Sequence, residues 1–562
     1  MSLRQDEREP WPPRPWIMAA VCAVAGLLFN WLTKVHSIEP SPGREAGATF
    51  IGIAAISFVL TVERRRWSWA AAFAVAWGLV IALVGWFTAR YNQRGEIFEW
   101  PFLAGIFAVA IAAPLFQTVR DEGAWRIPYE RLHRHAWVDG VIAGASLFFT
   151  GVAFVLAFLI GALFDLIGIR LIKDLLNDSW FGWMLAGIAF GGALGLLRER
   201  DALLGTLHRL VMVVFSVMAP VLAAALTIFL ISFPLTGFKD HGPFDGATPV
   251  LLALAVAAFV FTNAVIGDGR QERSPSRVLL LSALILILTI LPLGLLSAWS
   301  LGQRIGQYGW TPERMWGVVA IGVTIAYGAA GWWSAIRRQL EFDEALRPVQ
   351  IKLAIGLCAL ALFLALPIVD FGAVSANSQL ARLHRGQVDA AKFDWQAMAF
   401  EFGPAGRRRL ADIARTGPAD QRVMASAALK SKGRYEVQEA VEAATAAPLV
   451  RQNLRVVPAG TAVPEGAMAV IERSSWCREA TCVLTFVDAD KAILAGSQAR
   501  DGQVQSLRIG RGEDGRWNQY DDWQPYARVT PPRPNLDGKA EIRTVQRRQL
   551  FIDGKPVGDV FE

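Results

Sequence analysis

Eleven apolar segments dominate this chain, and each is long enough to cross a lipid bilayer as a helix. A helix rises about 1.5 Å per residue, so about 20 mainly apolar residues span the hydrocarbon core. No segment has a central Asp, Glu, Lys or Arg. The sequence therefore predicts an all-α polytopic membrane bundle. The segments are residues 15–32, 46–62, 67–88, 100–118, 137–163, 179–197, 210–233, 247–266, 278–299, 316–333 and 351–369.

Composition agrees with a membrane protein. Of the 562 residues, 53% are hydrophobic and 19% are charged, whereas a soluble domain carries about 25% charged residues. Many of the 21 tryptophans stand at segment ends, where indole rings favour the membrane interface. Four cysteines are too few for a disulfide-rich scaffold, and the net charge of +7 is spread over many loops. We therefore expect the lipid bilayer, and no nucleic acid, as a partner.

Lysine and arginine are distributed unevenly between alternating loops. Twenty lie at one set of segment ends: Arg4, Arg8, Arg14, Arg64, Arg65, Arg66, Arg120, Arg126, Arg131, Arg134, Arg198, Arg200, Arg209, Arg270, Arg273, Arg277, Arg337, Arg338, Arg347 and Lys352. Nine lie at the other: Lys34, Arg44, Arg90, Arg94, Arg170, Lys173, Lys239, Arg304 and Arg314. The positive-inside rule places the first set in the cytoplasm. The N-terminus is then predicted inside and the C-terminal region outside.

Composition changes after Asp370, and the sequence predicts four regions. Residues 1–14 form a cytoplasmic tail, 15–370 the membrane domain, 371–449 a helical module and 450–562 a small β-rich domain. Within the last region, β-branched and alternating stretches predict strands. These stretches are residues 454–457, 468–472, 483–487, 504–509 and 541–545, followed by a hairpin over 549–560 that turns at Asp553-Gly554.

Cys477 and Cys482 are the only cysteines outside the apolar segments, and they flank a four-residue turn. The predicted topology places both in an oxidising compartment, so we expect a disulfide that closes this turn. Two reduced thiols are the alternative. A metal site is disfavoured, because the pair supplies only two ligands and no His is near.

Polar residues in or near the segments offer few functional candidates. Asp139, Asp165, Asp268 and Asp370 lie at segment ends, where we expect water to solvate them. The tripeptide His133-Arg134-His135 is interpreted as a solvated, lipid-facing basic patch rather than a metal site. Asn30 and Asn263 lie within segments and are predicted to form interhelical hydrogen bonds.

Glycine spacing points to one close helix contact. Gly187, Gly191 and Gly195 repeat every four residues, so one face of the sixth segment is almost bare backbone. We interpret this face as a helix-packing surface. A dimer contact or a pore-lining groove remains the alternative.

Catalytic signatures are missing from the sequence. It contains no P-loop, nucleophile elbow, His-Glu-x-x-His or dinucleotide motif. We therefore predict no catalytic, cofactor-binding or metal-binding residues and no cofactor, and we do not expect an enzyme.

Two stretches resemble a known family. Residues 302–314, Gly-Gln-Arg-Ile-Gly-Gln-Tyr-Gly-Trp-Thr-Pro-Glu-Arg, precede the tenth segment, and residues 378–394 run from Ser378-Gln-Leu-Ala-Arg-Leu to Phe393-Asp394 before Gly403 and Gly406. Both resemble the bacterial multi-pass membrane proteins grouped as domain of unknown function 4153. The likeness covers roughly residues 100–415. It implies a bacterial inner membrane protein, in which the outside C-terminal region predicted from the loop charges would be periplasmic, and it supplies no catalytic residues.

The first of these stretches has the chemistry of a turn into a helix. Tyr308-Gly309 breaks the chain, Thr311 can cap the next helix and Pro312 suits its first turn. Structural capping is the preferred interpretation of this outer-face motif. The alternative is that Arg304 and Arg314 contact an anion or a lipid headgroup.

Three functional hypotheses follow. The first is a non-enzymatic membrane protein whose C-terminal domain interacts with an envelope protein partner or senses a signal. The second is a permease or channel for a small neutral or lipidic substrate, with a polar cavity lined by Asn30, Asn263, Thr324 or Tyr327. The third is an enzyme on lipid-linked substrates with a pocket near Arg304, Arg314 and Asp370. The sequence leaves the oligomeric state open.

Overall fold

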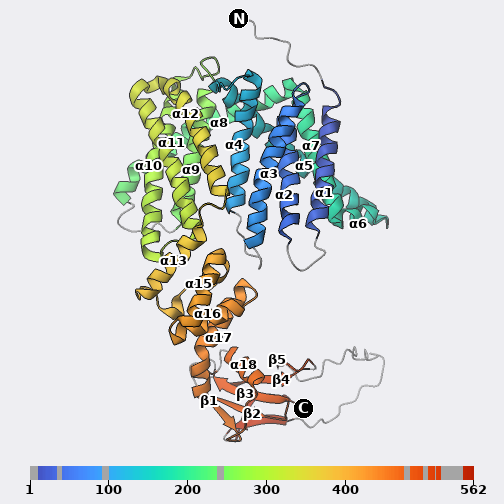
Figure 1. The fold of residues 1–562 in the computed structure, drawn as a ribbon, viewed down its shortest axis with the longest axis vertical. Helices are drawn as coiled ribbons and strands as arrows, with labels where there is room; N and C mark the ends of the chain where they lie inside the picture. Colours follow the sequence, from blue (N-terminus) through green and yellow to red (C-terminus); the bar gives the residue numbers. More distant parts are fainter. Residues whose placement is uncertain are drawn as a thin grey trace. The chain divides into compact units, whose positions relative to one another are not determined.

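The chain divides into two compact units, residues Met1–Gln379 and Leu380–Glu562. The structure, a computed structural model, describes residues 11–34, 41–91, 100–236, 246–473, 477, 481–497, 504–512, 514–520, 548–552 and 554–561. The first unit is a bundle of long helices and the second combines short helices with a sheet (Figure 1).

In the first unit each predicted apolar segment coincides with a helix, although the last segment, 351–369, extends past the end of its helix at Ala365. Among the described residues, ten helical stretches are long and apolar enough to cross a membrane, and the last of these, Pro312–Ala365, holds two helices. The predicted count of about eleven is therefore confirmed as an approximate one. The helices are α1 (Arg14–Thr33), α2 (Pro42–Thr61), α3 (Trp67–Tyr91), α4 (Trp100–Glu122), α5 (Tyr129–Leu166), α6 (Leu171–Asn177), α7 (Ser179–Glu199), α8 (Asp201–Thr236), α9 (Ala247–Ile266), α10 (Arg277–Tyr308), α11 (Pro312–Arg338) and α12 (Phe342–Ala365).

Helix α10 supplies much of a large buried cluster in this unit. Leu286, Ile287, Ile290 and Leu293 of α10 are almost fully buried, and Phe342 at the start of α12 packs with them. By contrast, α5 and α8 expose long apolar faces. Lipid tails are as apolar as leucine, so such exposure is stable in a bilayer.

One end of the bundle is named here the arginine-rich end. It comprises the loops 62–66, 123–128, 267–276 and 339–341 with the adjoining helix ends, and it lies at the top of the first unit in Figure 1. These loops carry many residues of the larger basic set. The opposite end carries the turn from α10 to α11 and the start of α13 (Phe371–His384).

The second unit contains a five-stranded mixed sheet and a hairpin. Strand β1 pairs parallel with β2, while β2, β3, β4 and β5 pair antiparallel in sequence order. Two strands, β6 and β7, form a separate antiparallel hairpin. The strands are β1 (Leu454–Val457), β2 (Cys482–Phe486), β3 (Lys491–Ser497), β4 (Val504–Arg511), β5 (Trp517–Tyr520), β6 (Arg548–Ile552) and β7 (Lys555–Phe561).

Short helices precede this sheet and one helix packs against it. The helices are α14 (Trp395–Phe400), α15 (Gly403–Thr416), α16 (Ala419–Lys430), α17 (Arg434–Asn453) and α18 (Glu465–Arg473). Helix α18 covers the stretch 468–472 that was predicted as a strand, so that prediction is wrong. Val470 and Ile471 are both buried, which a strand with one buried face does not allow for consecutive residues. The predicted strand 541–545 lies outside the described residues.

Candidate functional site

The outer-face motif forms the turn between α10 and α11. Gly309 has φ +76°, a conformation that favours glycine. The Thr311 side chain accepts a hydrogen bond from the Arg314 backbone N–H at 3.4 Å, and Pro312 occupies the first turn of α11. The Arg314 guanidinium donates to the Gly309 carbonyl at 2.5 Å and lies 5.6 Å from the Tyr308 ring centre. Arg314 therefore stabilises its own turn.

The two stretches that carry the family resemblance meet at this turn. The Gln379 side-chain amide donates to the carbonyl of Tyr308 at 2.9 Å and to that of Trp310 at 3.0 Å. The Trp310 backbone N–H donates to Ser378 Oγ at 3.3 Å. Residues about 70 positions apart thus supply hydrogen-bond partners for the backbone groups of one turn.

Asp370, which the third hypothesis places near Arg304 and Arg314, serves local structure. Asp370 Oδ1 accepts a hydrogen bond from the Ala373 backbone N–H at 2.9 Å and so caps the first turn of α13. Arg304 is half-buried on α10. Arg314 and Asp370 bind backbone groups of their own surroundings, which gives no support to a shared pocket for a lipid-linked substrate.

Gly187, Gly191 and Gly195 lie against the backbone of α1. A Cβ atom at Gly187 would overlap the Cys22 carbonyl, and one at Gly191 would overlap the Met18 carbonyl. At Gly195 a Cβ would stand 2.6 Å from the Pro15 Cα.

The contact between α1 and α7 is reciprocal, because a Cβ at Gly26 of α1 would overlap the Trp183 carbonyl of α7. A similar contact that the sequence analysis missed joins α11 to α10. There a Cβ at Gly328 would stand 2.5 Å from the Leu291 backbone nitrogen. Gly328 and Gly331 are three residues apart, so the four-residue spacing that marks α7 could not reveal them.

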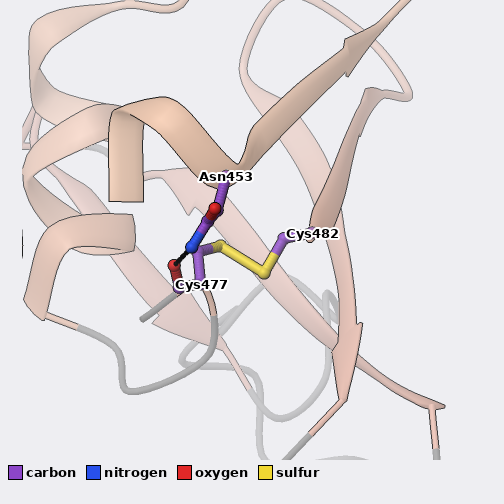
Figure 2. Close-up of a disulfide and its surroundings, with 3 residues drawn as sticks. All are labelled: Asn453, Cys477 and Cys482. Carbon is purple, nitrogen blue, oxygen red and sulfur yellow. Dashed lines mark hydrogen bonds between the residues drawn. A yellow bond between two sulfur atoms is a disulfide. The ribbon is translucent and has the colours of Figure 1, made fainter. Parts of the chain in front are cut away.

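A disulfide joins Cys477 and Cys482 in the second unit (Figure 2). Both cysteines are fully buried and lie in a core with Val450 and Leu484. The Asn453 side-chain amide, at the end of α17, donates to the Cys477 carbonyl at 3.1 Å (Figure 2). The disulfide and the Asn453 hydrogen bond together hold the start of β2 next to the end of α17.

At the arginine-rich end, side chains from three helices bind the last carbonyls of α2. Arg14 donates to the Val62 carbonyl at 3.0 Å, and Arg198 lies 3.4 Å from the same oxygen. Arg120 donates to the Thr61 carbonyl, and Gln117 donates to that of Leu60 at 3.2 Å. The last carbonyls of a helix lack internal partners and carry partial negative charge, so guanidinium groups stabilise them.

Asp139 completes this cluster and corrects one expectation. It was expected to be solvated, yet it is only 9% exposed. Gln117 donates to its Oδ2 at 2.7 Å, and Arg198 lies 3.9 Å from its Oδ1. The carboxylate is retained at low exposure because it offsets the charge of the neighbouring guanidinium groups.

A second group of charges fastens the α9–α10 loop to the start of α12. Asp343 is fully buried, 3.0 Å from Arg347 and 3.4 Å from Arg273. Arg347 also donates to the Ile266 carbonyl at 2.9 Å. Glu344 forms a more exposed pair with Arg270. We call these residues the α12 clasp.

The Tyr129 hydroxyl is the centre of a buried hydrogen-bond network. Its oxygen lies 2.7 Å from Gln350 Oε1, 3.1 Å from Asn263 Oδ1 and 3.1 Å from His133 Nδ1. The network links α5, α9 and α12. The interhelical hydrogen bond expected of Asn263 is therefore present.

His133 contradicts the interpretation of residues 133–135 as a solvated patch. It is only 6% exposed, because the first turns of α5 extend the apolar segment and turn this residue towards α12. His135 Nε2 lies 3.1 Å from the Asp121 carboxylate, while Arg134 is exposed. Only Arg134 matches the predicted patch.

Of two other polar residues proposed to line a cavity, Thr324 contacts its own helix and Tyr327 packs against α9. Thr324 donates to the Ala320 carbonyl of its own helix at 2.8 Å, and the Tyr327 ring packs edge-on against Phe259 at 5.0 Å. Within the part of the chain that the structure describes, no three His, Cys, Asp or Glu side chains are arranged to hold a metal ion.

Comparisons with known proteins give one match. Residues 48–399, well over half of the chain, match the family described as domain of unknown function (DUF4153). The match begins earlier than the resemblance did and ends before Gly403 and Gly406. No curated protein and no solved structure matches. With its many apolar helices, the chain is an integral multi-pass membrane protein, and it belongs to the DUF4153 family.

Proposed function

We propose that this protein is a non-enzymatic inner membrane protein that presents residues 380–562 to a protein partner on the periplasmic side. Its role would be envelope interaction or sensing. The observation that carries the proposal is that these residues form a compact unit with its own buried core. A unit of this kind can bind a partner without the membrane helices.

Two further observations support the orientation. The basic residues of the first unit lie mainly at the arginine-rich end, which the positive-inside rule assigns to the cytoplasm. The Cys477–Cys482 disulfide lies in the second unit, and disulfides persist in oxidising compartments such as the periplasm. Both argue for a periplasmic second unit.

Site-specific photo-crosslinking in cells tests the partner. A photoreactive amino acid replaces Tyr435 on α17, whose side chain is 88% exposed. The matched control replaces Trp125, which is 94% exposed in the loop between α4 and α5. We expect an adduct of defined mass from position 435 and none of that mass from position 125.

The crosslinking result, together with a solute-flux measurement, separates this proposal from the permease alternative. The proposal fails if positions 423, 435 and 449, all exposed on α16 and α17, give no protein adduct. A permease would instead show solute flux into proteoliposomes that a chain lacking residues 450–562 retains.

A further inference from the structure

The loop between α2 and α3 carries three consecutive arginines at the arginine-rich end. Arg64, Arg65 and Arg66 are exposed, and α3 begins directly after them. Trp67 and Trp69, in the first turn of α3, are 61% and 58% exposed. Guanidinium groups and indole rings are therefore both accessible at the same end of this helix.

Trp69 continues the exposed apolar face of α3. Ala76 and Leu83 follow it at intervals of seven residues, or about two helical turns, so the three side chains share a face. All three are exposed, whereas Ala70 and Ile81 on the opposite face are fully buried. Exposed apolar side chains of a membrane helix contact lipid tails, and tryptophan favours the membrane interface. The exposed face of α3 therefore passes from lipid tails at Leu83 to the headgroup level at Trp69.

Hydrogen bonds hold the α2–α3 loop against α4. The Arg66 guanidinium donates to the Arg120 carbonyl in the last turn of α4. The Arg120 guanidinium donates in turn to the Thr61 carbonyl at the end of α2. The chain is thus fixed on both sides of Arg64 and Arg65. A ligand that binds there loses little free energy to the ordering of the loop.

The α2–α3 loop is positively charged. Beside its three arginines it contains one acidic residue, Glu63, whose carboxylate lies 3.4 Å from the Arg14 guanidinium of α1. Basic residues next to a bilayer are attracted to the surface charge of anionic lipids. The position of this loop at the headgroup level therefore favours an anionic lipid as its neighbour.

We propose that the α2–α3 loop and the exposed face of α3 bind an anionic phospholipid. Its phosphate contacts Arg64 and Arg65, because guanidinium groups bind phosphate through paired, charge-assisted hydrogen bonds. Its acyl chains lie along Leu83, and Trp69 lies at the glycerol level between the two, where indole rings are favoured. The apolar part of this surface distinguishes the lipid from free phosphate, which has no acyl chains to place there.

Native mass spectrometry of the full-length protein in detergent tests the proposal, because it resolves each bound lipid by its mass. Phosphatidylglycerol, which is anionic, and phosphatidylcholine, which is zwitterionic, are titrated separately. We expect the first phosphatidylglycerol to bind more tightly than the first phosphatidylcholine. The double variant Arg64→Gln, Arg65→Gln should weaken phosphatidylglycerol binding about tenfold, since both charges next to the phosphate are lost. Trp69→Ala should also lower this affinity, so the proposal does not depend on one variant.

The control is the double variant Arg408→Gln, Arg409→Gln, which removes the same charge from two adjacent, exposed arginines of α15. It should leave lipid binding unchanged. Equal affinity of the unaltered protein for the two lipids would overturn the proposal, as would an unchanged affinity for phosphatidylglycerol after Arg64→Gln, Arg65→Gln. An equal loss in the control would show that net charge, and not this loop, attracts the lipid, which also overturns it. None of these results bears on the proposed role of residues 380–562.

Discussion

The α1–α7 contact and the arginine-rich end hold helices of the same unit together by opposite means. In the α1–α7 contact, glycines bring the two helix backbones together. At the arginine-rich end, buried ion pairs and side-chain bonds to helix carbonyls join the helices. The first region should therefore be sensitive to added volume, and the second to the loss of a single charge.

The largest effect is expected for Asp343→Asn in the α12 clasp. The substitution keeps the shape but leaves Arg273 and Arg347 without their buried counter-charge, which costs about 3–5 kcal/mol. Glu344→Gln is the matched control, because its exposed ion pair contributes about 0–1 kcal/mol. Thermal unfolding in detergent measures both. Equal losses for the two variants would show that burial does not distinguish the two carboxylates.

A smaller loss is expected for Gly191→Ala. The new methyl group would overlap the Met18 carbonyl, and such overpacking costs about 1–3 kcal/mol. Gly192→Ala is the control, since its Cβ would stand 3.7 Å from Ala19 Cβ, an ordinary contact. If both variants unfold at the same temperature, the close backbone contact at Gly191 does not make this region sensitive to added volume.

Tyr129→Phe tests the uncharged part of the arginine-rich end. Loss of the hydroxyl removes a hydrogen bond of 2.7 Å to Gln350 and leaves that amide oxygen buried. We expect a destabilisation of about 1–2 kcal/mol, less than for Asp343→Asn. A denaturation midpoint like that of the unaltered protein would show that the network adds nothing to stability.

The smallest predicted effect is a gain in stability. Gln339, between α11 and α12, is exposed and has φ +49° and ψ −117°, a region of backbone conformation that costs about 1–3 kcal/mol for a residue with a side chain. Gln339→Gly relieves that strain but increases the conformational entropy of the unfolded chain. We therefore expect the free energy of unfolding to rise by about 1 kcal/mol. A lowered melting temperature would contradict this reading of the turn.

The sequence predicted what depends on long patterns. Apolar length located the membrane helices, and the α10–α11 turn was predicted because Gly309, Thr311 and Pro312 act through the local backbone. Buried polar residues were not predicted. His133 and Asp139 look like loop-end residues in sequence, and only the packing of distant helices shows that both are buried.

Short patterns were ambiguous because only tertiary packing decides which of their residues are buried. Residues 468–472 fit a strand over five positions, but α18 begins earlier, at Glu465, and buries two consecutive residues. Five positions are too few to distinguish the two periodicities. The contact of Gln379 with the α10–α11 turn was also hidden, because a single sequence does not show which distant residues meet.

The central claim is that residues 380–562 lie on the periplasmic side of the membrane, and paired reporter fusions test it directly. Alkaline phosphatase is active only where its disulfides form, outside the cytoplasm, whereas green fluorescent protein exported unfolded stays dark. Fused after Glu562, the phosphatase should be active and the fluorescent protein dark, and insertion into the α9–α10 loop should reverse both. A fluorescent, phosphatase-inactive C-terminus would place the second unit in the cytoplasm and contradict the account.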